Sequence, residues 1–224
     1  HEYYTMIAAM DDHIGRVING MKAKGVWDDT LVIMTSDHGD MMGAHRLRLK
    51  GTLPYDELYR VPLIVKPPAS VDVARPVVDD LVSLERLAGT IARGAGLEDH
   101  GFAGGDFWTE IISDQPPTPP DEQRVFFEHY AAYWGVHPFY GVRTQTHKVI
   151  RYYGEDDTVE MYDLAADPHE LHNVADDPAY AAVRDQLLTE ADAWWAATDG
   201  RTAEEYASEA FKGFEAFQMA DRGA

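Results

Sequence analysis

Residues 31–40 read LVIMTSDHGD, an apolar run that stops at an Asp-His pair followed by a glycine. The β-branched and aliphatic residues of the run are typical of a buried strand. In open α/β sheets, ligands bind at the carboxyl ends of the strands, and Asp37 and His38 stand at that end of this one. Carboxylate oxygen and imidazole nitrogen both bind metal ions. The stretch therefore predicts a strand that delivers two ligands to a metal site.

The segments on either side of this strand predict an α/β unit. Apolar residues recur at helical spacing over residues 3–24, upstream of the strand. Downstream, residues 55–60 indicate a short helical turn, and residues 61–65 read VPLIV, which predicts a second buried strand. Helical spacing returns over residues 81–92. The predicted order is helix, strand, strand, helix.

The chain changes character at about residue 101. Residues 101–120 are rich in Gly, Pro and Asp and predict a loop between two domains. Short aromatic-rich runs beyond it predict antiparallel hairpins, followed by a helix over residues 178–197 and a weaker amphipathic helix in the tail. The runs are residues 125–127, 140–143, 148–153 and 159–162, with the clearest turn at 154–157. We therefore expect two domains, residues 1–120 and 121–224.

The composition limits the class of protein and its partners. The chain has 224 residues, of which 45% are hydrophobic, enough for a globular core. A formal net charge of −20 disfavours nucleic acid and anionic membrane surfaces as partners. No apolar stretch approaches the roughly 20 residues of a membrane span, so we expect a soluble protein. The absence of cysteine is compatible with either a cytoplasmic or a periplasmic or secreted location, which leaves the compartment open.

The chain resembles the sulfatases, the formylglycine-dependent branch of the alkaline phosphatase superfamily. The resemblance rests on a series of short motifs that occur in the family's order. They are IGRV at 14–17, DTLVI at 29–33, TSDHG at 35–39, Gly43, His45, Lys50, Tyr55 and RVPLI at 60–64. A second series resembles the C-terminal sulfatase subdomain: VRT at 142–144, KVI at 148–150, MYDL at 161–164, Asp167, Pro168, Glu170, Leu171 and Asn173.

The resemblance implies a fold and an activity. The fold is α/β, part of an alkaline-phosphatase-like mixed sheet flanked by helices, with a smaller C-terminal subdomain of an antiparallel sheet and helix. The activity is a metal-dependent sulfuric ester hydrolase that acts on a small anionic sulfate ester. In the family, a divalent ion acts together with a hydrated formylglycine nucleophile.

The resemblance also assigns roles to four residues. Asp37 and His38 fall on the two late metal-ligand positions. Lys50, thirteen residues after Asp37, falls on the lysine that contacts the sulfate group and the leaving oxygen. A cationic donor at that place stabilises charge as the ester bond breaks. His45 matches a histidine that several relatives carry in this loop, and both substrate contact and orientation of the loop by hydrogen bonds stay open for it.

The metal expected from the resemblance is one divalent ion. Calcium is the family's usual ion, and many members have Asn at the position of His38. A neutral imidazole is a better ligand for Mn²⁺ or Zn²⁺ than for Ca²⁺. We therefore expect Ca²⁺ by resemblance, with Mn²⁺ and Zn²⁺ as the alternatives that His38 introduces.

The resemblance covers only the C-terminal half of a sulfatase. The family's nucleophile motif is absent, because the chain has no Cys and no Ser or Thr with Pro two and Arg four residues later. The family's early Asp-Asp metal pair is also absent, since Asp11-Asp12 lies inside a predicted helix and Asp79-Asp80 opens another. Two ligands bind a divalent ion weakly. We therefore expect the missing N-terminal half, or a complementary chain, as a partner that completes the site.

Two other functions stay open beside the leading sulfatase hypothesis. A phosphonate monoester or phosphodiester hydrolase of the same superfamily would keep the Asp-His pair and the downstream lysine. A non-catalytic interaction module would keep only the fold, and metal would not stabilise it, because stabilisation requires binding to the native state. The sequence does not separate the first of these from a sulfatase.

Overall fold

The computed structural model describes residues 2–48, 50–99, 101–113, 118–129, 138–153 and 158–200. The chain divides into two compact units: unit 1 is His1–Thr35 with Pro62–Pro117, and unit 2 is Ser36–Val61 with Thr118–Ala224. The segment that carries the Asp-His pair and Lys50 is thus grouped with the C-terminal hairpins. The predicted turn at 154–157 and the predicted tail helix lie outside the described residues.

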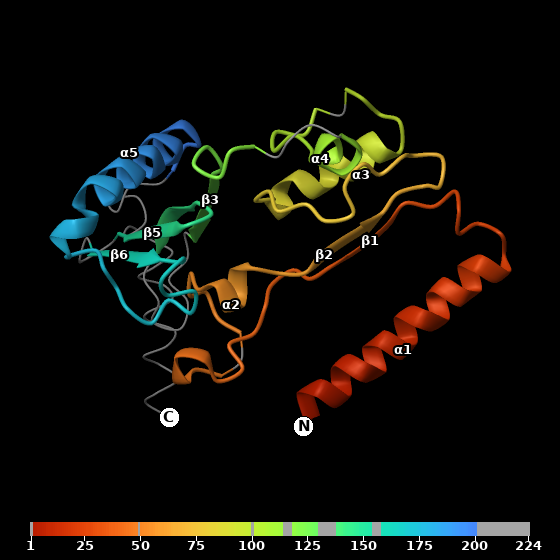
Figure 1. Cartoon of the computed structure of the whole chain (residues 1–224), viewed down its shortest axis with the longest axis horizontal. Coiled ribbons are helices and arrows are strands. Elements are labelled where there is room, and N and C mark those ends of the chain that lie inside the picture. The colour runs from red at the N-terminus through yellow and green to blue at the C-terminus, as the bar shows by residue number, and fades with distance from the viewer. Residues whose placement is uncertain are drawn as a thin grey trace, which may run out of the picture. The chain divides into compact units, whose positions relative to one another are not determined.

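Unit 1 begins with the predicted order of helix, strand, strand. Helix α1 spans Glu2–Ala23, and strands β1 and β2 span Val32–Thr35 and Leu63–Lys66 (Figure 1). The strands pair antiparallel, with Ile33 opposite Val65. The two strands are less buried than predicted: all four β1 residues are half-buried and Ile64 is exposed. The reason is that, within the described residues, the two strands pair only with each other.

The rest of unit 1 is helical and partly departs from the predictions. The helix predicted over 81–92 begins later, as a 3₁₀ turn η2 at Leu84–Arg86 followed by α3 at Leu87–Gly94. The stretch predicted to be loop contains a short helix, α4, at Trp108–Ile112. It forms because Phe107, Trp108 and Ile111 bury their side chains in a common cluster. Leu31, Leu63, Val65 and Leu87 pack against this cluster, which is the core of unit 1.

Unit 2 is built on the antiparallel sheet that the aromatic-rich runs predict. Its four strands lie in the order β3-β4-β5-β6. They span Val125–His129, Phe139–Arg143, His147–Tyr152 and Thr158–Asp163. Each strand pairs with the next along the chain, as in a meander of hairpins. The predicted hairpins are confirmed.

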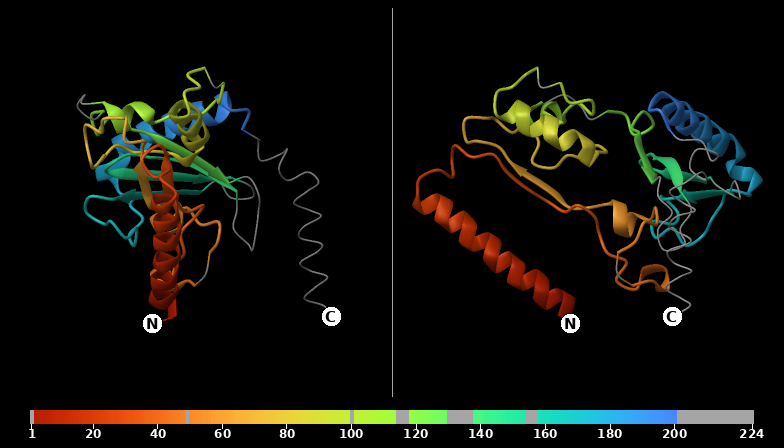
Figure 2. Two further views of the ribbon diagram at one scale, coloured as in Figure 1. Left: turned by 90° about the vertical axis from the view of Figure 1, so that its right-hand side faces the viewer. Right: turned by 180° about the vertical axis from the view of Figure 1, so that it is seen from behind.

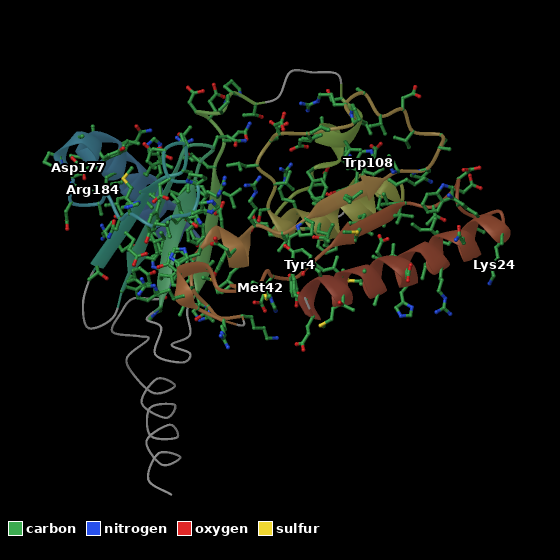
Figure 3. All side chains as sticks on the ribbon, turned by 60° about the horizontal axis from the view of Figure 1, so that its bottom comes forward. Tyr4, Lys24, Met42, Trp108, Asp177 and Arg184 are labelled. Atoms are coloured by element: carbon green, nitrogen blue, oxygen red, sulfur yellow. The ribbon has the colours of Figure 1, made fainter. Side chains whose placement is uncertain are left out.

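Helix α5 covers one face of this sheet (Figure 2). It spans Ala181–Ala197 and follows a 3₁₀ turn, η3, at Pro178–Tyr180, which agrees with the helix predicted over 178–197. The start is fixed by Asp177, whose Oδ1 accepts the backbone N–H of Ala179 at 2.9 Å; Figure 3 labels Asp177 and Arg184 at this end of α5. The fully buried core between helix and sheet consists mainly of Val142, Val149, Met161, Leu187 and Ala191.

The segment around α2 covers the opposite face of the sheet. Helix α2 spans Asp56–Tyr59, within the predicted turn. The ring of Tyr59 lies 5.6 Å from that of Phe127, and the ring of Tyr55 lies 6.2 Å from that of Tyr162. Because successive side chains of a strand point to opposite faces, Lys148 and Ile150 point toward α2 while Val149 points toward α5. The sheet is therefore the middle layer of unit 2.

The helices of the described residues include no candidate for a membrane span. Among the described residues, none combines the length and apolar character needed to cross a bilayer.

The α5 layer yields a stability prediction. Leu187→Ala should lower the free energy of unfolding by about 2–5 kcal/mol, because it removes buried methyl groups from the core under the sheet. Urea unfolding followed by circular dichroism measures the change. Leu171→Ala, at an exposed leucine of the same unit, is the control and should cost less than about 0.5 kcal/mol. Equal effects of the two substitutions would contradict this placement of the core.

Candidate active site

Asp37 and His38 follow β1 after one intervening residue, Ser36, close to the predicted place at the carboxyl end of the strand. Their short turn is held by local hydrogen bonds: the Ser36 hydroxyl donates to the His38 carbonyl at 2.8 Å, and Asp37 Oδ1 accepts the His38 backbone N–H at 3.0 Å. His38 Nδ1 lies 2.8 Å from the carbonyl oxygen of Gly39. A proton on Nδ1 donates to that carbonyl, and Nε2 is then left with its lone pair for a ligand.

The geometry of the pair fits two ligands of one ion. His38 Nε2 lies 3.7 Å from Asp37 Oδ2, and the side chains are 42% and 86% exposed. Metal–ligand bonds of about 2.0–2.6 Å let donors at this separation meet at a common ion. The backbone N–H of His38, which Asp37 accepts, lowers the pKa of Asp37 and so favours the carboxylate that a metal requires. No third His, Cys, Asp or Glu completes such a group within the described ranges.

Gly39 brings the next part of the segment against α2. Its backbone N–H donates to the Leu58 carbonyl at 2.8 Å. A Cβ atom at this position would lie 1.8 Å from the backbone oxygen of Glu57, so only glycine permits the approach. The loop beyond it turns sharply, with Met42, His45 and Arg46 all in the left-handed backbone region. Such conformations are costly for side-chain-bearing residues and persist only where surrounding contacts hold them.

His45 lies against α2, and Lys50 is exposed. The His45 ring stacks on Tyr55 with centroids 3.9 Å apart, and its Nε2 lies 3.9 Å from Glu57 Oε2. Its side chain is 13% exposed. Lys50 points into solvent. Within the described residues, no ion pair or hydrogen bond joins Lys50 to Asp37 or His38, which share its segment.

Sequence reasoning missed Asp56, the side chain that joins this segment to the sheet. Asp56 Oδ2 accepts from Arg143 Nη2 at 2.9 Å, and Asp56 Oδ1 accepts from Lys148 Nζ at 2.5 Å. A signal was present: Lys148 directly precedes Val149 and Ile150 at the start of the predicted strand 148–153, and a charge buried beside them needs a partner. The partner's identity could not be read from the sequence, because it lies 92 residues away.

The close approach at Gly39 yields a second prediction. Gly39→Ala should destabilise unit 2 by about 1–3 kcal/mol, because the new methyl group overlaps the Glu57 carbonyl and the backbone must shift. Urea unfolding gives the free energy, and hydrogen exchange should show faster exchange in residues 39–60. Gly51→Ala is the matched control, since a Cβ there meets nothing within 4 Å, and should change stability by less than about 1 kcal/mol. If Gly39→Ala behaves like the control, the packing of this segment is refuted.

Two family models match the chain. Residues 43–194 match the model described as N-sulphoglucosamine sulphohydrolase, C-terminal. Residues 1–65 match a model described as a protein of unknown function. The first match covers more than half of the chain and includes His45, Lys50 and the hairpin sheet of unit 2.

Individual proteins are similar over most of the chain. The N-acetylglucosamine-6-O-sulfatase of Bacteroides thetaiotaomicron is 30% identical over 190 residues, which are 84% of this chain and 34% of that protein. A solved protein in complex with its substrate D-glucosamine-2-N,6-O-disulfate has a TM-score of 0.77 at 26% identity, covering 91% of this chain and 41% of that one. The phosphonate monoester hydrolase of Agrobacterium radiobacter has a TM-score of 0.70 at 31% identity, covering 87% and 40%. The chain spans about a third of the length of the first relative.

Proposed function

The chain belongs to the sulfatase family, and from this premise we propose that it supplies the late part of a metal-dependent sulfuric ester hydrolase site. The α/β fold expected from the resemblance, part of an alkaline-phosphatase-like sheet with a C-terminal sheet-and-helix subdomain, is confirmed by its solved neighbours. Asp37 and His38 bind the ion, and Lys50 contacts the sulfate ester. The observation that carries the proposal is the 3.7 Å separation of His38 Nε2 and Asp37 Oδ2 at the end of β1.

The residues of this chain have distinct tasks in the proposed site. A bound divalent ion supplies positive charge that polarises the ester. Asp37 contributes a carboxylate oxygen, and His38 contributes its Nε2 nitrogen. Lys50 donates to the oxygen on which charge develops as the ester breaks. Local cations are needed here, because a chain with a net charge of −20 otherwise repels an anionic ester.

The ion and the missing parts follow from the donor set. Calcium is our proposal from the family, and Mn²⁺ or Zn²⁺ follow from the imidazole of His38. Two donors do not complete the coordination of any of these ions. We therefore propose a partner segment, the N-terminal half or a complementary chain, that contributes further ligands and the formylglycine nucleophile. The substrate is a small anionic sulfate ester.

A second candidate is a phosphonate monoester or phosphodiester hydrolase. It is favoured by the similarity to the Agrobacterium radiobacter enzyme, and the same Asp-His pair and lysine serve a tetrahedral phosphorus ester. A non-catalytic interaction module is the third candidate. It requires neither a metal nor a reactive lysine, so the two predictions below separate it from both hydrolases.

The metal proposal predicts stabilisation by a divalent ion. Ca²⁺, Mn²⁺ or Zn²⁺ at about ten times its Kd should raise the free energy of unfolding by about 1.4 kcal/mol, because the ion binds the native state. Thermal unfolding in each ion, against a chelator, measures the effect. Asp37→Asn and His38→Gln should abolish it, while Asp29→Asn, at an exposed acid outside the pair, should retain it. An equal response of all three variants refutes the assigned ligands, and no response to any ion favours the interaction module.

The lysine proposal predicts a loss of turnover. Lys50→Ala in the protein produced by its natural host should lower kcat/KM for an aryl sulfate by about 10²–10³, the effect of removing one donor to a developing anion. Lys24→Ala, at an exposed lysine after α1, is the control and should leave kcat/KM unchanged. Parallel assays with an aryl phosphonate rank the two hydrolase functions.

The intact mass of the active species shows whether residues 1–224 act alone or together with a further segment. We expect activity only where a longer chain or a partner accompanies residues 1–224. Hydrolysis by a lone 25.1 kDa chain would overturn the proposal of a divided site.

A further inference from the structure

Lys148 is a buried cation that the proposed chemistry does not use. It lies on β5, its side chain is 1% exposed, and its Nζ contacts three oxygens. These are Asp56 Oδ1 at 2.5 Å, Glu170 Oε1 at 2.5 Å and the Pro54 carbonyl at 3.0 Å. The contacts with Asp56 Oδ1 and the Pro54 carbonyl are hydrogen bonds, and the contact with Glu170 Oε1 is an ion pair, since that oxygen accepts no hydrogen bond. Burial of a charge is costly unless it is paired and hydrogen-bonded, and here both conditions are met.

Glu170 is the second buried charge, and the backbone turn at residues 167–170 directs its side chain into the interior. Its side chain is fully buried, and its backbone φ of 55° lies in the left-handed region. The turn closes through the Glu170 N–H, which donates to the Asp167 carbonyl at 3.1 Å. Glu170 Oε2 accepts the backbone N–H of Asp56 at 2.7 Å, at the start of α2. Burial raises the pKa of Glu170, and the nearby ammonium of Lys148 offsets this only in part.

Asp56 also forms an ion pair with Arg143. The guanidinium donates to both carboxylate oxygens of Asp56, Nε to Oδ1 at 3.2 Å and Nη2 to Oδ2 at 2.9 Å. Burial raises the pKa of Asp56, but the hydrogen bonds from Arg143 and Lys148 outweigh it and the pKa is lowered. The two cations and two carboxylates form a neutral cluster. We call Arg143, Lys148, Glu170 and Asp56 the α2 clamp.

The clamp grips the segment that carries the candidate lysine. Helix α2 has four residues and no side-chain cap of its own, so the Glu170 carboxylate performs that task. The neighbours of Asp56 hold the rest of the segment: the Leu58 carbonyl accepts the Gly39 N–H, and the Tyr55 ring stacks on His45. Fixing Asp56 thus fixes both ends of residues 39–55, the span in which Lys50 lies.

We propose that Arg143, Lys148 and Glu170 are positioning residues, which act through Asp56 to hold the Lys50-bearing segment in place on the sheet. They belong to the motifs of the C-terminal subdomain that the proposed chemistry left without a role. The role of Lys50 in this proposal rests on the proposed function. The mechanical part, that the clamp holds residues 39–55 on the sheet, does not depend on that function. Through the α2 clamp, residues of the C-terminal subdomain thus help to position the proposed active site.

Limited proteolysis tests the mechanical part in the 224-residue chain. Trypsin cuts after arginine and lysine, and Arg46 and Arg48 lie in the held segment. Lys148→Met leaves Glu170 without its cation and Asp56 with Arg143 alone, so the buried cluster carries a net negative charge. Cleavage after Arg46 and Arg48 should therefore accelerate at least tenfold at temperatures well below the unfolding midpoint. Hydrogen exchange should rise in residues 39–60 and stay unchanged in β4 and α5.

A second pair of variants keeps the test decisive. Glu170→Gln retains an acceptor for the Asp56 N–H and should accelerate cleavage less than Lys148→Met. The double variant Lys148→Met/Glu170→Gln removes one charge of each sign and should be cleaved more slowly than Lys148→Met alone. Additive acceleration in the double variant would overturn the proposal.

The matched control is an ion pair on the other face of the same sheet. Arg124 Nε lies 2.5 Å from Glu190 Oε2 and joins the start of β3 to α5. Glu190→Gln should leave cleavage after Arg46 and Arg48 within twofold of the wild type. Equal acceleration in this control, or a lower midpoint of Lys148→Met without faster local cleavage, would mean that the clamp only stabilises the fold.

Kinetics test the link to Lys50 in an active preparation. Lys148→Met should lower kcat at least tenfold in the wild-type background and less than threefold in the Lys50→Ala background, because its effect passes through Lys50. Equal factors in both backgrounds overturn the link. If no preparation hydrolyses a sulfate or phosphonate ester, the proposed function fails, while the proteolysis result still decides whether the clamp holds the segment.

Discussion

The buried ammonium of Lys148 is the constraint on which unit 2 depends. A strand alternates its faces, so Lys148 points toward α2 only if Val149 points toward α5. A shift of the strand by one residue would place the charge in the apolar core beside Met161 and Leu187. Since a buried charge without a partner is costly, the lysine selects one register of β5. The register of β5 then fixes its partners β4 and β6.

The same charge explains why the segment 36–61 belongs with the C-terminal sheet. Without Asp56, the α2-facing side of the sheet would hold two cations and one carboxylate among the aromatic side chains of Phe139 and Tyr162. Asp56 makes the cluster neutral, and its ion pairs hold the flanking residues of segment 36–61 against the sheet. Asp37 and His38 directly precede Gly39, which is hydrogen-bonded to Leu58. The position of the proposed ligands in unit 2 is therefore set in part by residues more than 80 positions later in the chain.

The sequence predicted what depends on local periodicity and missed what depends on distant partners. The spacing of apolar residues located α1, and the aromatic-rich runs located β3 to β6. The sequence did not predict α4, because its three core residues lie between Gly- and Pro-rich stretches that indicate a loop. It also failed at Asp56, which lies beside Tyr55 in the motif series yet joins Lys148 and Glu170 across 92 and 114 residues. The ring of His45 stacks on Tyr55, a contact that sequence reasoning left open between two roles.

The two proposed metal ligands lead to a coupling between metal and partner. The hydrogen-bond geometry of His38 directs Nε2 toward Asp37 rather than toward the backbone, so the pair is preorganised. Preorganisation reduces the ordering cost of binding, but two donors still leave most of the coordination shell of a divalent ion to water. Further ligands from a partner segment would raise the affinity for the ion, and by thermodynamic reciprocity the ion would raise the affinity for that segment by the same factor. The metal is then part of what holds a complete site together as well as part of its chemistry.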